Sequence, residues 1–231
     1  MSGRNRIIEG LSRRELLAGI GAAVTVSVLE TASTPLFAMP SDFKHTMTTL
    51  FWVGEPSDAA NAFIPNNQSY WDQNWQQSFG GVDDPSHRIG YWPAKFKPKE
   101  NPFYFALPYG EFTEEGELKE AARRVPWFEP GLSPLLKNRW AEIRRGDRVC
   151  FAQWQDVGPC NENDFGYVFG KRPRPKNTFE ARAGLDVSPA VWTYLGMDDN
   201  DVTSWRFVDA SEVDEGPWKE IVTISGNNRG D

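Results

Sequence analysis

Alternating apolar and polar positions predict several β-strands along this chain. The run from Arg148 to Trp154 alternates in this way and is rich in β-branched and aromatic residues, as is typical of a half-buried strand. Gly158 and Pro159 follow it and should end the strand, because proline donates no backbone hydrogen bond and glycine accepts a sharp turn. Further strands are predicted over 48–54, 101–109 and 204–208, and a strand or a tail over 218–224.

A short helix is predicted over 189–195. Ser188 is suited to cap its start, Pro189 to occupy its first position and Gly196 to end it. Asp186 therefore lies where a strand gives way to a capped helix. On this local pattern alone, such an aspartate is typical of a turn or a cap.

Two more helices are expected in a region of about 55–146, inserted between strands. The stretch from Thr113 to Arg124 has acidic residues near its start and two arginines at its end, which suits the helix dipole. A second helix is predicted after Gly131, because apolar residues recur there at spacings of four, four and three. These residues are Leu132, Leu136, Trp140 and Ile143.

The loop over 55–99 has no periodicity of its own and carries many aromatic residues. A loop of this length is usually functional or disordered, and its aromatic content argues against disorder. We expect most of these side chains to cover the core and some to form a ligand surface. The candidate substrate-binding residues, in this loop and in the neighbouring strands, are Trp52, Tyr70, Trp71, Trp92 and Trp154.

Charge and length limit the kinds of partner and fold. The 231 residues carry a formal net charge of −7, so a nucleic-acid partner is not expected: no basic face is evident to neutralise phosphates. A single core is ample at this length. The two histidines and the two cysteines show no metal-ligand spacing, so neither a metal site nor another cofactor is predicted.

The first 38 residues are predicted to be an export signal. A basic start, the pair Arg13 and Arg14 followed by two leucines, and an apolar stretch over 18–29 resemble a twin-arginine signal. An ordinary secretory signal and an uncleaved anchor are the alternatives; the anchor is the weaker one, because the apolar run is shorter than the ~20 residues of a membrane span. We expect residues 39–231 to form one domain, periplasmic or secreted, with no stable membrane span after cleavage.

Export leaves the state of the cysteines open. An oxidising compartment permits a disulfide between Cys150 and Cys160. An extended strand after Cys150 carries the chain away from it, however, so a bridge requires an early turn.

The central region resembles the double-psi β-barrel proteins. Asp156-x-Gly158-Pro159, a polar loop, and Gly184-x-Asp186-x-Ser188 before a short helix match, in order and spacing, a pattern of this superfamily. Its members include the rare lipoprotein A proteins, the expansins, the family-45 endoglucanases and the MltA-type lytic transglycosylases. The similarity covers roughly residues 147–208. It implies a mainly β fold, a six-stranded double-psi β-barrel with helical and loop insertions.

The resemblance also implies catalytic residues. In the glycan-cleaving members, the aspartate that matches Asp186 is a general acid, which needs a pKa raised by apolar surroundings. Asp156 matches a recurring acidic position and is the second catalytic candidate; the alternative is a structural role, in which it holds a turn by bonding backbone amides. Hydrolysis with inversion needs a second carboxylate ~6.5–9.5 Å away, and Glu55 and Asp58 are the best placed.

These inferences lead to one expected function and two alternatives. We expect an exported protein that binds a cell-wall glycan such as peptidoglycan and cleaves its glycosidic bonds through Asp186. The alternatives are a non-catalytic, expansin-like wall-binding module and an exported scaffold for protein contacts.

Overall fold

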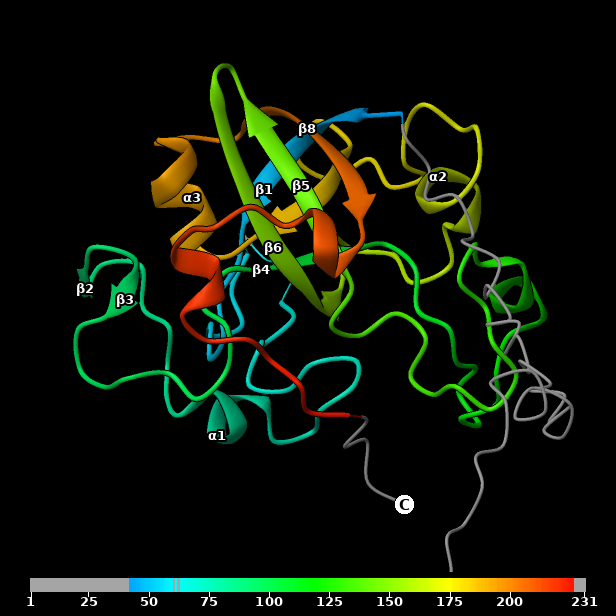
Figure 1. Ribbon diagram of the computed structural model, residues 1–231, viewed down its shortest axis with the longest axis horizontal. Helices are drawn as coiled ribbons and strands as arrows, with labels where there is room; N and C mark the ends of the chain where they lie inside the picture. The colour runs from blue at the N-terminus through cyan, green and yellow to red at the C-terminus, as the bar shows by residue number, and fades with distance from the viewer. Residues whose placement is uncertain (1–41, 60, 62, 227–231) are drawn as a thin grey trace, which may run out of the picture. The chain divides into compact units, whose positions relative to one another are not determined.

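The computed structural model describes residues 42–59, 61 and 63–226, and the predicted export signal over 1–38 lies outside them. Six strands form a closed barrel in the order β1-β7-β4-β6-β5-β8 (Figure 1). The strands are β1 (Lys44–Leu50), β4 (Tyr104–Leu107), β5 (Trp140–Arg145), β6 (Arg148–Val157), β7 (Ala183–Val187) and β8 (Asp201–Val208). The prediction of a mainly β fold with a six-stranded barrel is confirmed.

The barrel is mixed. β1 runs parallel to β7 and β4 runs parallel to β6, whereas the other neighbouring pairs are antiparallel. Parallel neighbours need long connections, and the segments between the strands carry the remaining elements.

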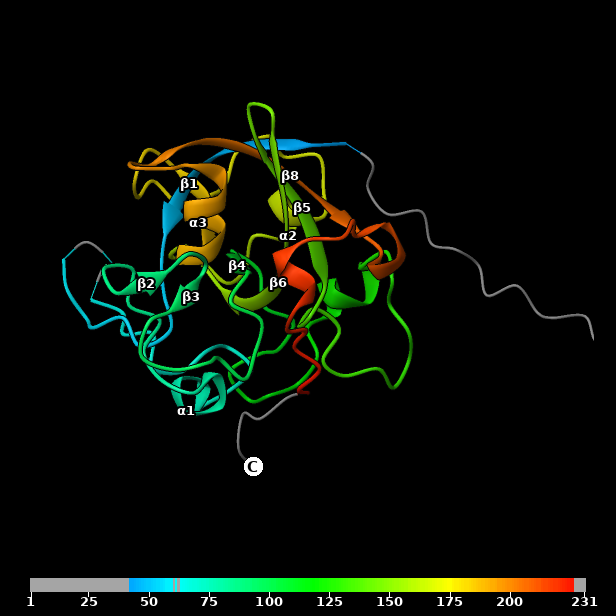
Figure 2. The same cartoon turned by 60° about the vertical axis from the view of Figure 1, so that its left-hand side comes forward.

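Short elements lie in these connections. They are α1 (Trp75–Phe79), β2 (Arg88–Ile89), β3 (Trp92–Pro93), η2 (Glu120–Arg124), α2 (Phe165–Val168), α3 (Pro189–Leu195), η3 (Ala210–Glu212) and η4 (Pro217–Lys219). Figure 1 and Figure 2 both show the β2–β3 hairpin and α1 outside the barrel, below α3. Among the described residues, no helix is long and apolar enough to cross a membrane.

Helix α3 begins and ends as predicted. The Ser188 hydroxyl accepts a hydrogen bond from the Val191 amide at 3.3 Å, and Pro189 occupies the first turn. Gly196 ends the helix in the left-handed conformation, with φ of 65°. A side chain at this position would also collide with the guanidinium of Arg148. The helix contacts β6, so its position is fixed against the strand that leads to Asp156.

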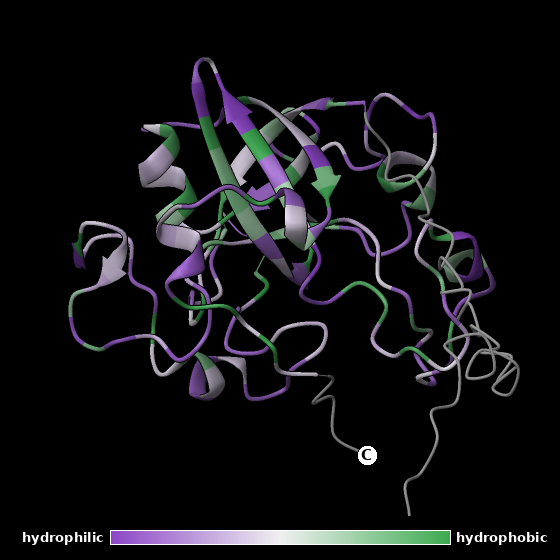
Figure 3. Cartoon of the chain, viewed as in Figure 1, coloured by the Kyte–Doolittle hydropathy of each residue, from purple (hydrophilic) through white to green (hydrophobic). Residues whose placement is uncertain are grey.

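Aromatic side chains fill the core. Trp154 stacks on Phe105 and Phe207, and the edge of Trp71 meets it at a centroid distance of 5.9 Å. Trp71 belongs to the loop that follows β1, which is therefore packed on the barrel, as predicted for most of its aromatic residues. Figure 3 shows apolar residues along β5, β6 and α3.

The two helices predicted over 113–124 and after Gly131 are wrong. Only Glu120–Arg124 is helical in the first stretch, as the 3₁₀ helix η2, and the left-handed Gly116 lies in the turn before it. The second stretch ends in β5. Trp140 to Ile143 are buried on both faces of this strand, so alternation is lost and the apolar spacing imitates a helix.

Strands β4 and β5 both lie within 55–146, the region expected to be one insertion. The barrel therefore carries two long connections there, 51–103 before β4 and 108–139 after it. The first of these connections builds one wall of the candidate site.

Candidate functional site

Asp186 and Asp156 lie on strands that flank β4. Ala106 of β4 pairs with Asp186 of β7 on one side and with Asp156 of β6 on the other. Strands are ~4.8 Å apart, so two spacings put the Cα atoms of the two aspartates about 10 Å apart. The methyl group of Ala106 leaves room between the two carboxyl groups.

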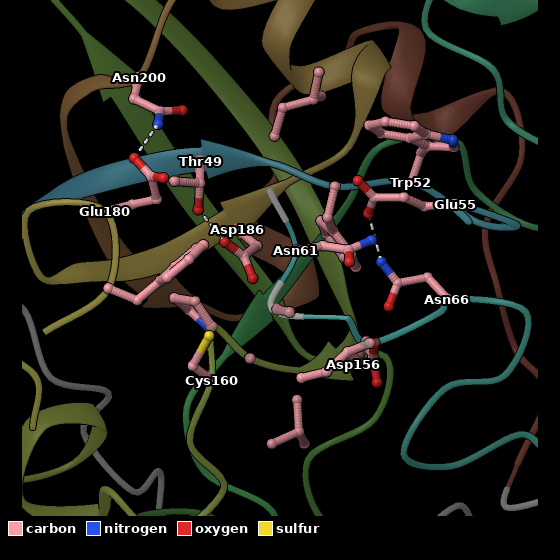
Figure 4. Close-up of a pocket in the computed structure, with 18 of the residues that line it drawn as sticks. Thr49, Trp52, Glu55, Asn61, Asn66, Asp156, Cys160, Glu180, Asp186 and Asn200 are labelled. Carbon is pink, nitrogen blue, oxygen red and sulfur yellow. Dashed lines mark hydrogen bonds between the residues drawn. The ribbon is translucent and has the colours of Figure 1, made fainter. Parts of the chain in front are cut away.

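The two aspartates line a cavity of about 250 Å³. Gly158 also lines the cavity. A Cβ atom at this position would stand 3.0 Å from Asp186 Oδ2 and 3.9 Å from the Ala106 methyl group. Figure 4 shows Thr49, Glu55, Asp156 and Asp186 around this space. The small residues 106 and 158 therefore help to make the carboxyl groups accessible from the cavity.

The carboxyl group of Asp186 is held by Thr49. The two residues are register partners on the parallel strands β1 and β7, and the Thr49 hydroxyl donates a hydrogen bond to Asp186 Oδ1. Burial, together with the negative charges of Glu55 and Asp156, raises the pKa of Asp186 to about 7 against the opposing effect of the Thr49 hydrogen bond. The group can thus exchange a proton near neutral pH.

Asp156 is buried and anchors the loop that covers it. Its Oδ1 accepts a hydrogen bond from the Tyr70 amide at 2.7 Å. Burial raises the pKa of Asp156 to about 7, although the Tyr70 and Val157 amides favour the charged form. The side chain therefore both holds a backbone amide and lines the cavity.

Glu55 comes from the loop after β1. Its Oε2 accepts a hydrogen bond from Asn66 Nδ2 at 2.7 Å, and the main chains of the same two residues are joined by an N–H···O bond of 3.0 Å. Burial raises the pKa of Glu55 to about 7, with the Asn66 and Trp52 hydrogen bonds opposing the shift. Glu55 is thus a third carboxyl group that titrates near neutral pH in this cavity.

A buried polar chain fixes the start of this loop. The Val53 amide donates to the Tyr104 hydroxyl at 3.0 Å, and that hydroxyl donates to Asp83 Oδ2 at 2.9 Å. Asp83 is in turn paired with Arg88. Val53 is thereby tied to β4, which limits the movement of Glu55 two residues further on.

The predicted substrate-binding residues do not gather at one place. Trp52 lines the cavity and is half-buried. Trp71 and Trp154 have no exposed surface, and Trp92 lies on the β2–β3 hairpin, outside the lining of the cavity. The ring of Tyr70 stacks on Phe112, and it is the backbone amide of Tyr70 that donates a hydrogen bond to Asp156.

Asp58, named from the sequence as a candidate, lines the cavity beside Glu55. Several other lining residues carried no sequence signal. Thr49 was missed, because only the register of β1 on β7 brings it to Asp186. At the rim, Asn200 Nδ2 donates to Glu180 Oε2 at 3.2 Å; both residues belong to loops without a motif.

The two cysteines are not bridged, and the described residues form no cluster of metal ligands. Cys150 is buried and Cys160 is exposed, and both are free thiols, so no bridge joins them. Within the described part of the chain, no group of three or more histidine, cysteine, aspartate or glutamate side chains could hold a metal ion.

Comparison with protein-family models and with curated proteins found no match for this chain. The geometry of the cavity is therefore the basis for the function proposed below.

Proposed function

We propose that this protein is an exported double-psi β-barrel enzyme that cleaves glycosidic bonds of a cell-wall polysaccharide, such as peptidoglycan, with Asp186 as the general acid. The observation that carries the proposal is the place of the Asp186 carboxyl group in a cavity, with its pKa raised to about 7. Below that pH the group keeps a proton that it can give to a glycosidic oxygen.

A second carboxyl group is available for the base. Glu55 lines the same cavity as Asp186, whereas the carboxyl group of Asp156 holds the Tyr70 amide, so we assign the base role to Glu55. It would activate water opposite the proton donor, as in inverting hydrolysis. Asp156 is held by the Tyr70 amide, and its carboxyl group, when ionised, raises the pKa of Asp186.

The fold assignment rests on strand order together with sequence. Two parallel pairs, β1 with β7 and β4 with β6, occur in one closed barrel. The Asp156-x-Gly158-Pro159 segment leaves β6, and Asp186 precedes the cap of α3 by two residues. Both features fit the superfamily named from the sequence. The twin-arginine segment supports export to the periplasm or the outside.

The test is release of soluble fragments from purified peptidoglycan and from cellulose. We expect the wild-type protein to release fragments and Asp186→Asn to lose at least about 10²-fold in rate, without a loss of melting temperature. Incorporation of ¹⁸O from labelled water into the new reducing end separates hydrolysis from transfer to a sugar hydroxyl.

The other outcomes identify the alternatives. Binding without cleavage by the wild-type protein would overturn the enzyme and leave a wall-binding module. Neither binding nor cleavage would leave a scaffold for protein contacts.

A further inference from the structure

One surface loop of this acidic protein is strongly basic. Residues 170–176 carry four cationic side chains and no carboxylate, whereas the whole chain has a formal net charge of −7. The segment follows α2 in the chain (Figure 1), and we call it the basic loop. Its four cationic residues are exposed; they are Lys171, Arg172, Arg174 and Lys176.

A buried carboxylate fixes the basic loop. Asp164 has no exposed surface, and its Oδ1 accepts a hydrogen bond from Arg172 Nη1 at 2.9 Å. Its Oδ2 accepts another from the backbone amide of Lys176 at 2.6 Å. Between these two points, Pro173 and Pro175 restrict the backbone. The cations are therefore held in place before a partner arrives, which lowers the entropy cost of binding.

Two of the four cations have no counter-charge in the described part of the chain. Arg172 is paired with Asp164. Neither Lys171 nor Arg174 forms an ion pair or a hydrogen bond with another described residue. Both charges are thus available to an anion that comes from outside.

The basic loop is not part of a hollow that would enclose a small ligand. None of its residues lines the cavity around Asp186, the hollow beside that cavity, or the hollows at α1 and at the β2–β3 hairpin. Small ligands bind in concave sites that cover most of their surface. Cations on an open loop are suited instead to an extended anionic surface.

The basic loop also lies where the chain enters the barrel. Lys44, the first residue of β1, donates a hydrogen bond from Nζ to the carbonyl oxygen of Gly170 at 2.9 Å. The sequence before Lys44 includes the apolar stretch 18–29, which is predicted to engage a membrane for export. The side of the barrel that carries the basic loop is therefore joined most directly to the segment expected at the membrane.

We propose that the basic loop docks this protein on the surface of a membrane that contains anionic phospholipids. The headgroups of such a bilayer present many phosphates in one plane, and lysine and arginine both bind phosphate. Each cation near an anionic bilayer strengthens binding about fivefold. Membrane docking goes beyond the proposed glycan cleavage and does not depend on it.

The first experiment measures co-sedimentation with vesicles of phosphatidylcholine alone and of equal parts phosphatidylcholine and phosphatidylglycerol. Lys171→Gln/Arg174→Gln should bind the anionic vesicles at least about fivefold more weakly than wild type, and this difference should shrink as salt is added. On phosphatidylcholine alone the two proteins should bind alike, because residues 1–41 are common to both. Equal affinity of the two proteins for the anionic vesicles would overturn the proposal.

A matched variant separates the basic loop from the net charge of the protein. Lys95 and Lys97 are exposed in the segment before β4. Lys95→Gln/Lys97→Gln removes the same charge as Lys171→Gln/Arg174→Gln and should bind the anionic vesicles like wild type. Equal weakening in both double variants would overturn a role for the basic loop.

A second experiment distinguishes a membrane from a soluble polyanion. The probe is long-chain polyphosphate, with affinity expressed per phosphate group. We expect the anionic vesicles to bind at least about tenfold more tightly, because a flexible polymer must be ordered on the loop whereas a bilayer presents its phosphates together. Tighter binding of polyphosphate, with the same dependence on Lys171 and Arg174, would overturn the membrane as the partner.

Failure of docking and failure of the proposed function have different signatures. Lys171→Gln/Arg174→Gln should melt like wild type, because neither side chain bonds to another described residue. It should also release soluble glycan fragments like wild type, since neither residue lines the cavity. Vesicle binding without glycan cleavage upholds docking and overturns the enzyme. Cleavage with vesicle binding that is unchanged in the loop variant overturns docking and leaves the enzyme.

Discussion

Thr49 and Asp186 face each other across the parallel strands β1 and β7, and the threonine hydroxyl donates a hydrogen bond to the carboxyl group. This contact favours the ionised carboxylate, whereas burial and the charges of Glu55 and Asp156 favour the protonated form. The pKa of about 7 is the balance of these effects. Each of them can be changed separately by mutation.

Thr49→Val should move the alkaline limb of the pH–activity profile to higher pH. Activity through a general acid is lost as pH rises through the pKa of Asp186, about 7 in the wild type. Removing a hydrogen bond to the charged form raises that pKa, by up to about one unit. The measurement is kcat/KM for fragment release over a pH range of about two units on either side of neutrality.

Thr48→Val is the matched control. Thr48 lies next to Thr49, but its hydroxyl bonds to that of Thr203 at 2.7 Å and not to Asp186. We expect this variant to lose stability without moving the alkaline limb. A limb that stays in place in Thr49→Val would show that Thr49 does not tune the acid.

Glu55→Gln should have the opposite effect on the same limb. Without the negative charge of Glu55, the pKa of Asp186 falls, so the alkaline limb moves to lower pH. Loss of the base should also lower kcat by about 10²-fold or more. Asp58→Asn serves as the control, because it removes another acidic side chain from the lining of the same cavity. Equal kcat losses in both variants would contradict the assignment of Glu55 as the base.

Gly158→Ala should reduce activity more than stability. The new methyl group would stand 3.0 Å from Asp186 Oδ2, so the carboxyl group must shift by a few tenths of an ångström. Misplacement of a proton donor by such an amount is expected to cost about tenfold in kcat. Gly226→Ala adds a methyl group where nothing lies within 4 Å and where φ is not left-handed, and should leave kcat as it is. Full activity of Gly158→Ala would mean that the geometry around Asp186 is looser than described.

Asp156→Asn should stabilise the protein at alkaline pH. The folded pKa of Asp156 is about 7, above the usual 3.8, so the folded state binds the proton more tightly than the unfolded state. The stability of the wild type therefore falls as pH rises from about 4 to about 7, and stays low above that range. Asparagine keeps an acceptor for the Tyr70 amide and has no charge to bury. At pH 8 its free energy of unfolding should exceed that of the wild type by about 1–4 kcal/mol.

Urea unfolding at pH 5 and pH 8 tests this expectation. The advantage of Asp156→Asn should shrink at the lower pH. Asp156→Ala, which leaves the Tyr70 amide without its acceptor, should gain less at pH 8. A lower stability of Asp156→Asn than of the wild type at both pH values would mean that the charge itself holds the loop.

Local signals were sufficient to predict α3. Ser188, Pro189 and Gly196 act within one turn of the helix they start or end, so no knowledge of the barrel was needed. The strand before Gly158 was predicted for a similar reason, and in the structure it extends to Val157.

Strand β5 could not be predicted in this way. Glu142 is buried there because Arg144 and Arg206 pair with it, and Arg206 belongs to the neighbouring strand β8. A buried charge in the middle of a strand breaks the alternation that marks strands in a sequence. Tertiary pairing, and not local propensity, decides the structure of this segment.

The site was predictable only in part. Asp156 and Asp186 could be named because a pattern of residues surrounds each of them. The pairing of Thr49 with Asp186 depends on strand register, and the approach of Glu55 depends on a loop closed by Asn66. Neither relation leaves a local trace in the sequence.

Strand β1 closes the barrel by pairing with β8, so that Lys44 lies opposite Trp205. Its other neighbour, β7, is also near the end of the chain. Contacts between segments so distant in sequence form slowly, because a long stretch of chain must be ordered before they stabilise anything. During synthesis, β1 leaves the ribosome before β7 and β8, and the backbone groups on both of its edges stay unpaired until these strands have been made. The carboxyl groups of Asp186 and Glu55 are therefore brought together only as a late event in the folding of the chain.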